Sequence, residues 1–208
     1  MVLRVGELEQ GGERLEAVGQ CCVPGRTHVV SVFLVATIVI PFRGDDPKRR
    51  LPEELRTELA QAMLADVLAA AGEVGPAIVA EGRGQGASVQ TALTEVRESP
   101  VLVVNADLPA VTPRDLLALL GSIPDGGIAV AAAPDGTTNG LGLAAPEVFE
   151  PLYGPGSAER FLRLAPSRLV EIPNLAADVD TVRDLERLEA RVGPKTWAAL
   201  DRLRSAVR

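Results

Sequence analysis

A chain of 208 residues is long enough to form one large domain with a substantial buried core. Hydrophobic residues make up 47% of the chain and aromatic residues only 3%, so Val, Leu, Ile and Ala must build the core, as in most α/β folds. The net charge of −7 argues against a surface that binds nucleic acid or an anionic membrane. Two adjacent cysteines and a single histidine exclude a disulfide framework and an ordinary zinc site.

The N-terminal region carries little pattern. Residues 1–34 show weak periodicity, and we expect a poorly ordered arm or a mis-set translation start without a role in the chemistry. The apolar stretch at 29–42 is too short and too late for a transmembrane helix or a typical signal peptide. Reduced cysteines favour the cytoplasm. We therefore expect a single domain at residues 35–208.

Strand and helix patterns alternate along that domain. The expected strands are 35–40, 76–80, 101–104, 128–133, 141–145 and 169–172, and the expected helices are 52–72, 88–96, 112–121, 157–164, 181–192 and one around Trp197. This alternation predicts an α/β fold with a mostly parallel central sheet and crossover helices. Thr112 with Asp115, and Thr181 with Asp184, have the spacing of capping boxes, and Ser157 is expected to cap its helix.

Three aspartates are the strongest functional signal. Asp107 follows the apolar run 101–104, at the strand end where open α/β sheets place their ligands. Asp178 and Asp180 form a D-x-D, so that in an extended chain both carboxylates point to one face. Three carboxylates without His or Cys partners suit a hard cation such as Mg²⁺. The alternative is that Asp107 and Asp180 are only turn or helix caps.

A basic loop follows the first expected strand. The segment from Pro41 to Arg50 contains Arg43, Lys48 and Arg50, and cations at the end of a first strand suit the phosphates of a nucleotide. The alternative is a solvated turn whose positive charge is balanced by Asp45 and Asp46.

Glycine-rich loops supply further candidates. The segment 135–140 offers backbone N–H groups and hydroxyls, and the segment 153–157 precedes a helix N-terminus, which is a favourable place for an anion. Both are equally consistent with ordinary turns. Gln85 and Gly86 contact a base or ribose in one interpretation and belong to a flexible connector in the other.

Taken in order, these motifs resemble those of the guanylyltransferases of coenzyme F-420 biosynthesis, which use 2-phospho-L-lactate or phosphoenolpyruvate. The resemblance spans about residues 36–188 and rests on Ile40-Pro41 with Lys48-x-Arg50-Leu51, Ala106-Asp107-Leu-Pro109, Asp135-Gly-Thr-Thr-Asn139, Tyr153-Gly154-Pro-Gly-Ser157-Ala and Ala177-Asp178-Val-Asp180-Thr181. It implies a Rossmann-like nucleotidyltransferase fold similar to that of the molybdenum-cofactor guanylyltransferases, with helices on both faces of the sheet.

The resemblance also implies roles for individual residues. Mg²⁺ would be held by Asp107, Asp178 and Asp180, and the GTP phosphates by Lys48 and Arg50, with Asp107, Lys48 and Arg50 forming the catalytic set. Pro41, Arg43, Gln85 and Gly86 would complete the nucleotide site. The phosphorylated three-carbon acid would be held by Thr138, Gly154 and Ser157.

The chain also departs from the family pattern. Arg43 stands where Lys is common, and the stretch between Gly72 and Ser88 is short for the usual elements of the base pocket. Two other functions therefore remain open: a sugar-1-phosphate or molybdopterin nucleotidyltransferase, and a nucleotide-binding module without turnover. The final helix around Trp197 either covers the sheet edge or makes a homodimer contact.

Overall fold

The computed structural model describes residues 17–23, 26–32, 36–43, 53–82, 84–97, 100–188 and 191–206. The chain divides into two units, Met1–Val35 and Ala36–Arg208. In the first, β1 (Ala17–Val23) and β2 (Arg26–Val32) pair as an antiparallel hairpin. No strand was predicted here, although Pro24-Gly25 is a dipeptide typical of turns and stands between two short apolar runs. The assignment of residues 1–34 as an arm or a mis-set start stays a prediction.

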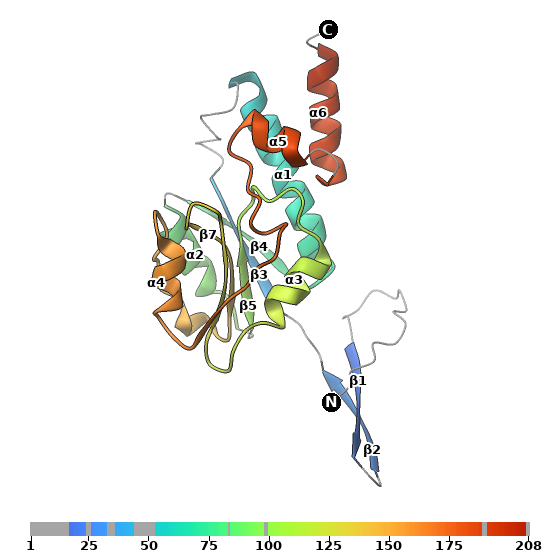
Figure 1. Cartoon of the computed structure of the whole chain (residues 1–208), viewed down its shortest axis with the longest axis vertical. Coiled ribbons are helices and arrows are strands. Elements are labelled where there is room, and N and C mark those ends of the chain that lie inside the picture. The colour runs from blue at the N-terminus through green and yellow to red at the C-terminus, as the bar shows by residue number, and fades with distance from the viewer. Residues whose placement is uncertain are drawn as a thin grey trace. The chain divides into compact units, whose positions relative to one another are not determined.

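The second unit is built on a six-stranded sheet with the order β4-β3-β5-β7-β6-β8 (Figure 1). Its strands are β3 (Thr37–Phe42), β4 (Ala77–Glu81), β5 (Val101–Val104), β6 (Ile128–Ala132), β7 (Thr138–Leu143) and β8 (Ser167–Leu169). β7 runs antiparallel to both β5 and β6, whereas the pairings of β3 with β4, β3 with β5 and β6 with β8 are parallel. The predicted mostly parallel α/β sheet is confirmed.

Helices cover both faces of this sheet. They are α1 (Glu53–Gly72), α2 (Gln85–Leu93), α3 (Pro113–Leu120), α4 (Ser157–Leu162), α5 (Val182–Leu188) and α6 (Pro194–Ala206), with a 3-10 turn at Pro146–Val148. The strand side chains alternate between two cores. Ile38 and Leu102 join the core beneath α1 and α3, and Val39 and Val103 join the core beneath α2 and α4 (Figure 1).

β7 allows α3 to approach the sheet closely. Its Gly140 and Gly142 face α3, and a Cβ at Gly142 would come within 2.7 Å of Ile123 Cγ1. The intervening Leu141 points to the opposite core and is fully buried. Glycine on one side of the strand and leucine on the other therefore fit a helix close to one face and a full core on the other.

Several predicted boundaries moved. α2 begins at Gln85 rather than Ser88, so Gln85 and Gly86 lie in the first turn of a helix and not in a flexible loop. β7 begins at Thr138 rather than Leu141 because pairing with β6 extends through Ala132 opposite Thr138. β8 occupies 167–169 rather than 169–172.

The prediction that Ser157 caps α4 is wrong. The N-cap is Gly156, in the left-handed conformation with φ 68°, and Ser157 is the first helical residue, with its side chain fully buried. A left-handed position before the helix favours glycine, which leaves the serine hydroxyl available for a different partner.

Both predicted capping boxes are confirmed. Thr112 Oγ1 accepts a hydrogen bond from Asp115 N, and the Asp115 carboxylate accepts one from Thr112 N. Thr181 and Asp184 form the same reciprocal pair at the start of α5. Each box satisfies backbone donors that a helix N-terminus leaves without intrahelical partners.

The C-terminal helix α6 packs against α1. Asp66 of α1 is 5% exposed and accepts hydrogen bonds from Lys195 N at 3.0 Å and Thr196 N at 2.8 Å, so it caps α6 from a distant part of the chain. Trp197 is 51% exposed, and its role in a homodimer contact stays a prediction. In the described part of the chain, no helix is long and apolar enough to cross a membrane.

Replacing Asp66 by Ala tests this long-range cap. We expect a loss of about 1–2 kcal/mol in the free energy of unfolding, the upper range for a lost N-cap, because two helix donors would lose their acceptor in a buried place. Hydrogen exchange at Lys195 and Thr196 should accelerate with it. The matched control is Glu58→Ala, which removes the exposed pair with Arg202 (2.9 Å) and should cost at most about 1 kcal/mol. Equal losses in urea titrations of both variants would contradict the cap.

Candidate active site

The end of β5 places the first predicted metal ligand. All four residues of β5 are at most 1% exposed. Asn105 follows the strand and leads into a turn that contains Asp107. The next residue, Leu108, is fully buried and anchors the turn in the core. The carboxylate is thereby held at the C-terminal edge of a parallel strand, where α/β sheets bind ligands.

The D-x-D segment is fixed beside this turn by its middle residue. Val179 is fully buried in the core formed with α1 and α5, and its N–H donates to Asp107 O at 3.0 Å. Because side chains alternate in an extended chain, burying Val179 turns Asp178 and Asp180 to the opposite side. The sequence-based placement of these two carboxylates on one face is thus matched by the structure.

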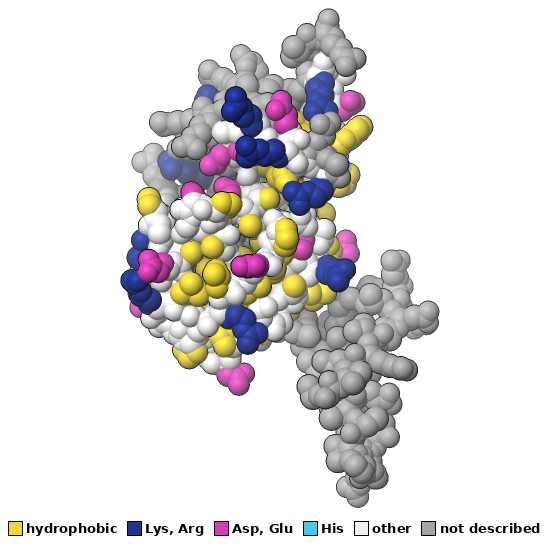
Figure 2. Space-filling model, viewed as in Figure 1, with side chains coloured by type: hydrophobic (Ala, Val, Ile, Leu, Met, Phe, Trp, Pro, Cys, Tyr) yellow, Lys and Arg dark blue, Asp and Glu magenta, His cyan; other side chains and the backbone are white. Residues whose placement is uncertain are grey.

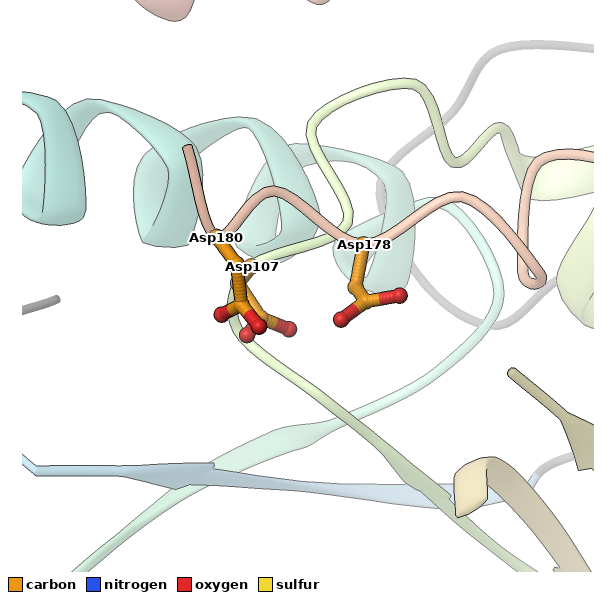
Figure 3. Close-up of side chains that lie close together, drawn as sticks. All are labelled: Asp107, Asp178 and Asp180. Atoms are coloured by element: carbon orange, nitrogen blue, oxygen red, sulfur yellow. The ribbon is translucent and has the colours of Figure 1, made fainter. Parts of the chain in front are cut away.

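Together the three aspartates form one cluster (Figure 3). Asp107, Asp178 and Asp180 each offer a carboxylate oxygen, and the three oxygens lie within 4.8 Å of one another. All three residues are partly buried. A set of oxygen donors with no His or Cys fits a hard divalent cation, and two or more carboxylates with remaining open positions suit one that also binds phosphates. The chemistry of the donor set therefore fits a divalent metal.

Burial and neighbouring negative charge both oppose the ionisation of Asp178. Burial raises the pKa of Asp178 above its ordinary value, and the neighbouring carboxylates of Asp107 and Asp180 raise it further. Asn139 Nδ2 opposes this by donating to Asp178 Oδ1 at 3.2 Å. A bound cation would favour the ionised form of all three carboxylates.

Only some of the predicted nucleotide-binding residues lie in the described part of the chain. Pro41 lies in β3, and Arg43 is exposed directly after it; Lys48 and Arg50 lie outside the described residues. Gln85 and Gly86 open α2, and Gly86 fits close to Pro151, where a Cβ would come within 2.7 Å of the proline Cβ.

The three residues predicted to bind the acceptor are brought together. Thr138 Oγ1 and Ser157 Oγ lie 2.9 Å apart and share a hydrogen bond, and Ser157 N donates to Gly154 O at 3.0 Å. Thr138 is 3% exposed and Ser157 fully buried. The two hydroxyls therefore join β7 to α4, and their role in substrate binding stays a prediction.

A pocket of about 520 Å³ adjoins the cluster of three aspartates. Its lining includes Asp178 and Asp180 on one side, Asp135 of the glycine-rich loop, and Arg187 and Arg191 from α5 and the turn after it. Arg187 also faces Asp184 at 3.8 Å. Figure 2 shows basic side chains gathered beside acidic ones over α5. Such mixed charge suits a bound cation accompanied by an anionic substrate.

Sequence reasoning missed two kinds of residue at this site. The arginines could have been found from their spacing, since positions 187 and 191 stand four residues apart in the helix predicted at 181–192, although α5 ends at Leu188. Asn105 and Asn139 appeared only as parts of motifs. They lie side by side because β7 pairs antiparallel to β5, and Asn105 N donates a hydrogen bond to Asn139 O at 3.0 Å.

Comparison with known proteins identifies a family. The model of the MobA-like NTP transferase domain matches residues 55–204. The phosphoenolpyruvate guanylyltransferase of Rubrobacter xylanophilus is 32% identical over 205 residues, covering 92% of this chain and 94% of that protein. The 2-phospho-L-lactate guanylyltransferase of Natrialba magadii is 31% identical, covering 71% of this chain and 80% of that protein.

Other similarities are more limited in extent or in depth. The phosphoenolpyruvate guanylyltransferase of Sphaerobacter thermophilus is 39% identical over 94 residues, which cover 42% of this chain and 45% of that protein. The solved 2-C-methyl-D-erythritol 4-phosphate cytidylyltransferase of Thermus thermophilus shares the fold, with a TM-score of 0.55 and 19% identity over 75% of this chain and 98% of that one.

Replacing Asp178 by Asn tests the cost of keeping an ionised carboxylate at this position. Because the folded pKa of Asp178 is raised, ionisation opposes folding; that cost is absent below the unfolded pKa of about 3.9 and grows as pH rises through the folded pKa. We expect the metal-free variant, melted in EDTA, to be at least as stable as wild type at pH 7. This advantage should shrink toward pH 4.

The matched control has the opposite sign. Asp135 is exposed, and its hydrogen bond from the Thr137 hydroxyl lowers its pKa, so its ionised form stabilises the fold above the unfolded value. Asp135→Asn should therefore lose a little stability at pH 7. A D178N protein that melts below wild type at pH 7 in EDTA would show that ionisation of Asp178 does not oppose folding.

Proposed function

Because the chain belongs to the MobA-like NTP transferase family, we propose that it is a guanylyltransferase that transfers GMP from GTP to phosphoenolpyruvate or 2-phospho-L-lactate, in coenzyme F-420 biosynthesis. The observation that carries this proposal is the carboxylate cluster at the C-terminal edge of β5, in a chain whose relatives of similar length carry these two names. We place the reaction in the cytoplasm, as the absence of a disulfide framework favours.

The reaction needs little acid–base chemistry from the protein. An oxygen of the acceptor phosphate attacks the α-phosphorus of GTP in line; a new P–O bond forms, the α–β bridging P–O bond breaks, and pyrophosphate leaves. A phosphate monoester has a second pKa of about 6 and is already largely dianionic at neutral pH. No general base is required, which agrees with a chain that contains a single histidine.

The residues of the cluster would hold the metal. Asp107, Asp178 and Asp180 would bind Mg²⁺, which when present neutralises charge on the phosphates. Asp107 comes from the turn after β5, and the other two from the segment fixed by Val179, so two distant parts of the chain must be folded together before the site exists.

Cationic side chains would position the triphosphate. We assign Lys48 and Arg50 to the GTP phosphates, with Arg43 and Pro41 at the end of β3 beside them. Gln85 and Gly86, at the N-terminal end of α2, would contact the guanosine. The chemistry then depends on positioning and on charge neutralisation, which can together supply most of the acceleration of a phosphoryl-type transfer.

The acceptor would be held by Thr138, Gly154 and Ser157. In this structure the hydroxyls of Thr138 and Ser157 bind each other, so an acceptor phosphate or carboxylate would replace that mutual hydrogen bond by two bonds to an anion. Hydrogen bonds to a charged acceptor are stronger than those between neutral groups, and this gain would have to exceed the cost of taking the anion out of water to two buried hydroxyls.

The direct test is pyrophosphate release with Mg²⁺ and GTP, with phosphoenolpyruvate and 2-phospholactate offered separately and ATP as the base control. Release that depends on one acceptor and on GTP identifies the reaction and the acceptor together. Release only with a sugar 1-phosphate or molybdopterin would assign the related transferase instead. Nucleotide binding by folded protein without release with any acceptor would make it a binding module.

Asp107→Asn tests the metal-dependent step. Losing one of three charged ligands should lower kcat by about 10²-fold or more, because several kcal/mol of charge stabilisation depends on the cation and each 1.4 kcal/mol is tenfold in rate. The fold should remain intact by circular dichroism. The control is Asp201→Asn, an exposed aspartate of α6, which should keep wild-type rates. Full activity in the Asp107 variant would remove this residue from the metal site.

A further inference from the structure

Three side-chain amides form a chain of hydrogen bonds, here called the relay, that ends at Asp178 of the aspartate cluster. Gln85 Nε2 donates to Asn105 Oδ1 at 2.6 Å, Asn105 Nδ2 donates to Asn139 Oδ1 at 3.2 Å, and Asn139 Nδ2 donates to Asp178 Oδ1 at 3.2 Å. The three amides come from α2, from the end of β5 and from the start of β7. The relay therefore connects the helix turn proposed to contact the nucleotide with a carboxylate proposed to hold the metal.

The relay has one direction, which its last member sets. An ionised carboxylate only accepts hydrogen bonds, so Asn139 must turn its NH₂ group toward Asp178 and its oxygen toward Asn105. Asn105 must then present its NH₂ group to Asn139 and its oxygen to Gln85. Reversing any one amide would set two oxygens, or two NH₂ groups, against each other.

Backbone contacts hold the relay in place. Asn105 Nδ2 also reaches Thr138 O at 3.3 Å, and Asn105 N donates to Asn139 O at 3.0 Å where β5 and β7 end their pairing. Asn139 is 3% exposed, so its amide has little water to bind instead. Rotation of these amides is thus restricted by the sheet edge as well as by one another.

We propose that Asn139, supported by Asn105 and Gln85, is a positioning residue of the metal centre that holds Asp178 Oδ1 and leaves the second carboxylate oxygen for the cation. This inference rests on the metal site of the proposed function. Groups that orient a ligand from behind typically contribute 10–100-fold to metal affinity. The relay would also fix Gln85 in the orientation in which it meets the nucleotide.

The first test replaces Asn139 by Ala in the full chain and titrates it with Mn²⁺ alone, followed by electron paramagnetic resonance. Mn²⁺ affinity should fall 10–100-fold, at a temperature where circular dichroism shows the variant folded. A wild type that binds no Mn²⁺ would remove the metal site itself. Wild-type binding together with unchanged affinity in the N139A variant would overturn the relay and leave the metal site standing.

The second test changes Gln85, the member of the relay farthest from Asp178, in protein shown to be folded by circular dichroism. Gln85 is half-buried, and Gln85→Glu at pH 7.5 replaces its NH₂ donor by a second oxygen facing Asn105. The relay can then keep its hydrogen bonds only if Asn105 reverses, giving up its bond to Thr138 O, and Asn139 follows, so that an amide oxygen would face Asp178. Mn²⁺ affinity should fall severalfold or more in this variant.

The sign of that change separates the relay from simple charge. An added negative charge near the cluster would by itself attract Mn²⁺ and raise its affinity. The matched control is Gln90→Glu, an exposed glutamine of the same helix that gains the same charge, and its Mn²⁺ affinity should equal or slightly exceed that of wild type. Unchanged or tighter binding in the Q85E variant would contradict the relay.

Discussion

The site depends on holding three like charges together against their mutual repulsion. The clustering has a cost at Asp178, whose pKa is raised by burial and by the neighbouring carboxylates of Asp107 and Asp180. What keeps them in place is apolar and backbone structure, chiefly the burial of Val179 and its hydrogen bond to the Asp107 carbonyl. The burial of the surrounding core therefore offsets the free-energy cost of a carboxylate cluster that is suited to binding a cation.

Two of the elements that make this possible follow directly from local sequence rules. An unbroken apolar run predicts a buried strand that ends before Asp107, and a D-x-D with an apolar middle residue predicts two carboxylates on one face. The capping box at Thr181 and Asp184 likewise fixes where α5 begins. For these positions each residue carries its own signal, and the structure places them as the sequence analysis expected.

The remaining parts could not be predicted because they depend on pairing between distant segments. The sequence pattern places Asn139 in a glycine-rich turn, whereas in the structure it lies in β7, which begins at Thr138. The strand begins there because Thr138 pairs with Ala132 of β6. Serine is a common N-cap residue, yet the N-cap of α4 is Gly156 in the left-handed conformation. The Ser157 hydroxyl shares a hydrogen bond with the Thr138 hydroxyl instead. Lys48 and Arg50 remain predictions because they lie outside the described residues.

The direction of β7 explains why its first residues carry so much of the site. A strand antiparallel to β5 begins at the edge where β5 ends, so its N-terminal residues reach the same edge as Asp107 without an intervening loop. The pairing with β6 shifts register here, because Ala131 pairs with Gly140 and Ala132 with Thr138, so that Asn139 is an extra residue in β7 and the regular alternation of side chains is interrupted. Thr138 contacts Ser157 of α4, and Asn139 contacts Asn105 and Asp178. One reversed strand thus brings Thr138 of the proposed acceptor site and Asn139, the partner of Asp178, to the edge where Asp107 lies. A parallel strand in its place would have put these two residues at the opposite edge.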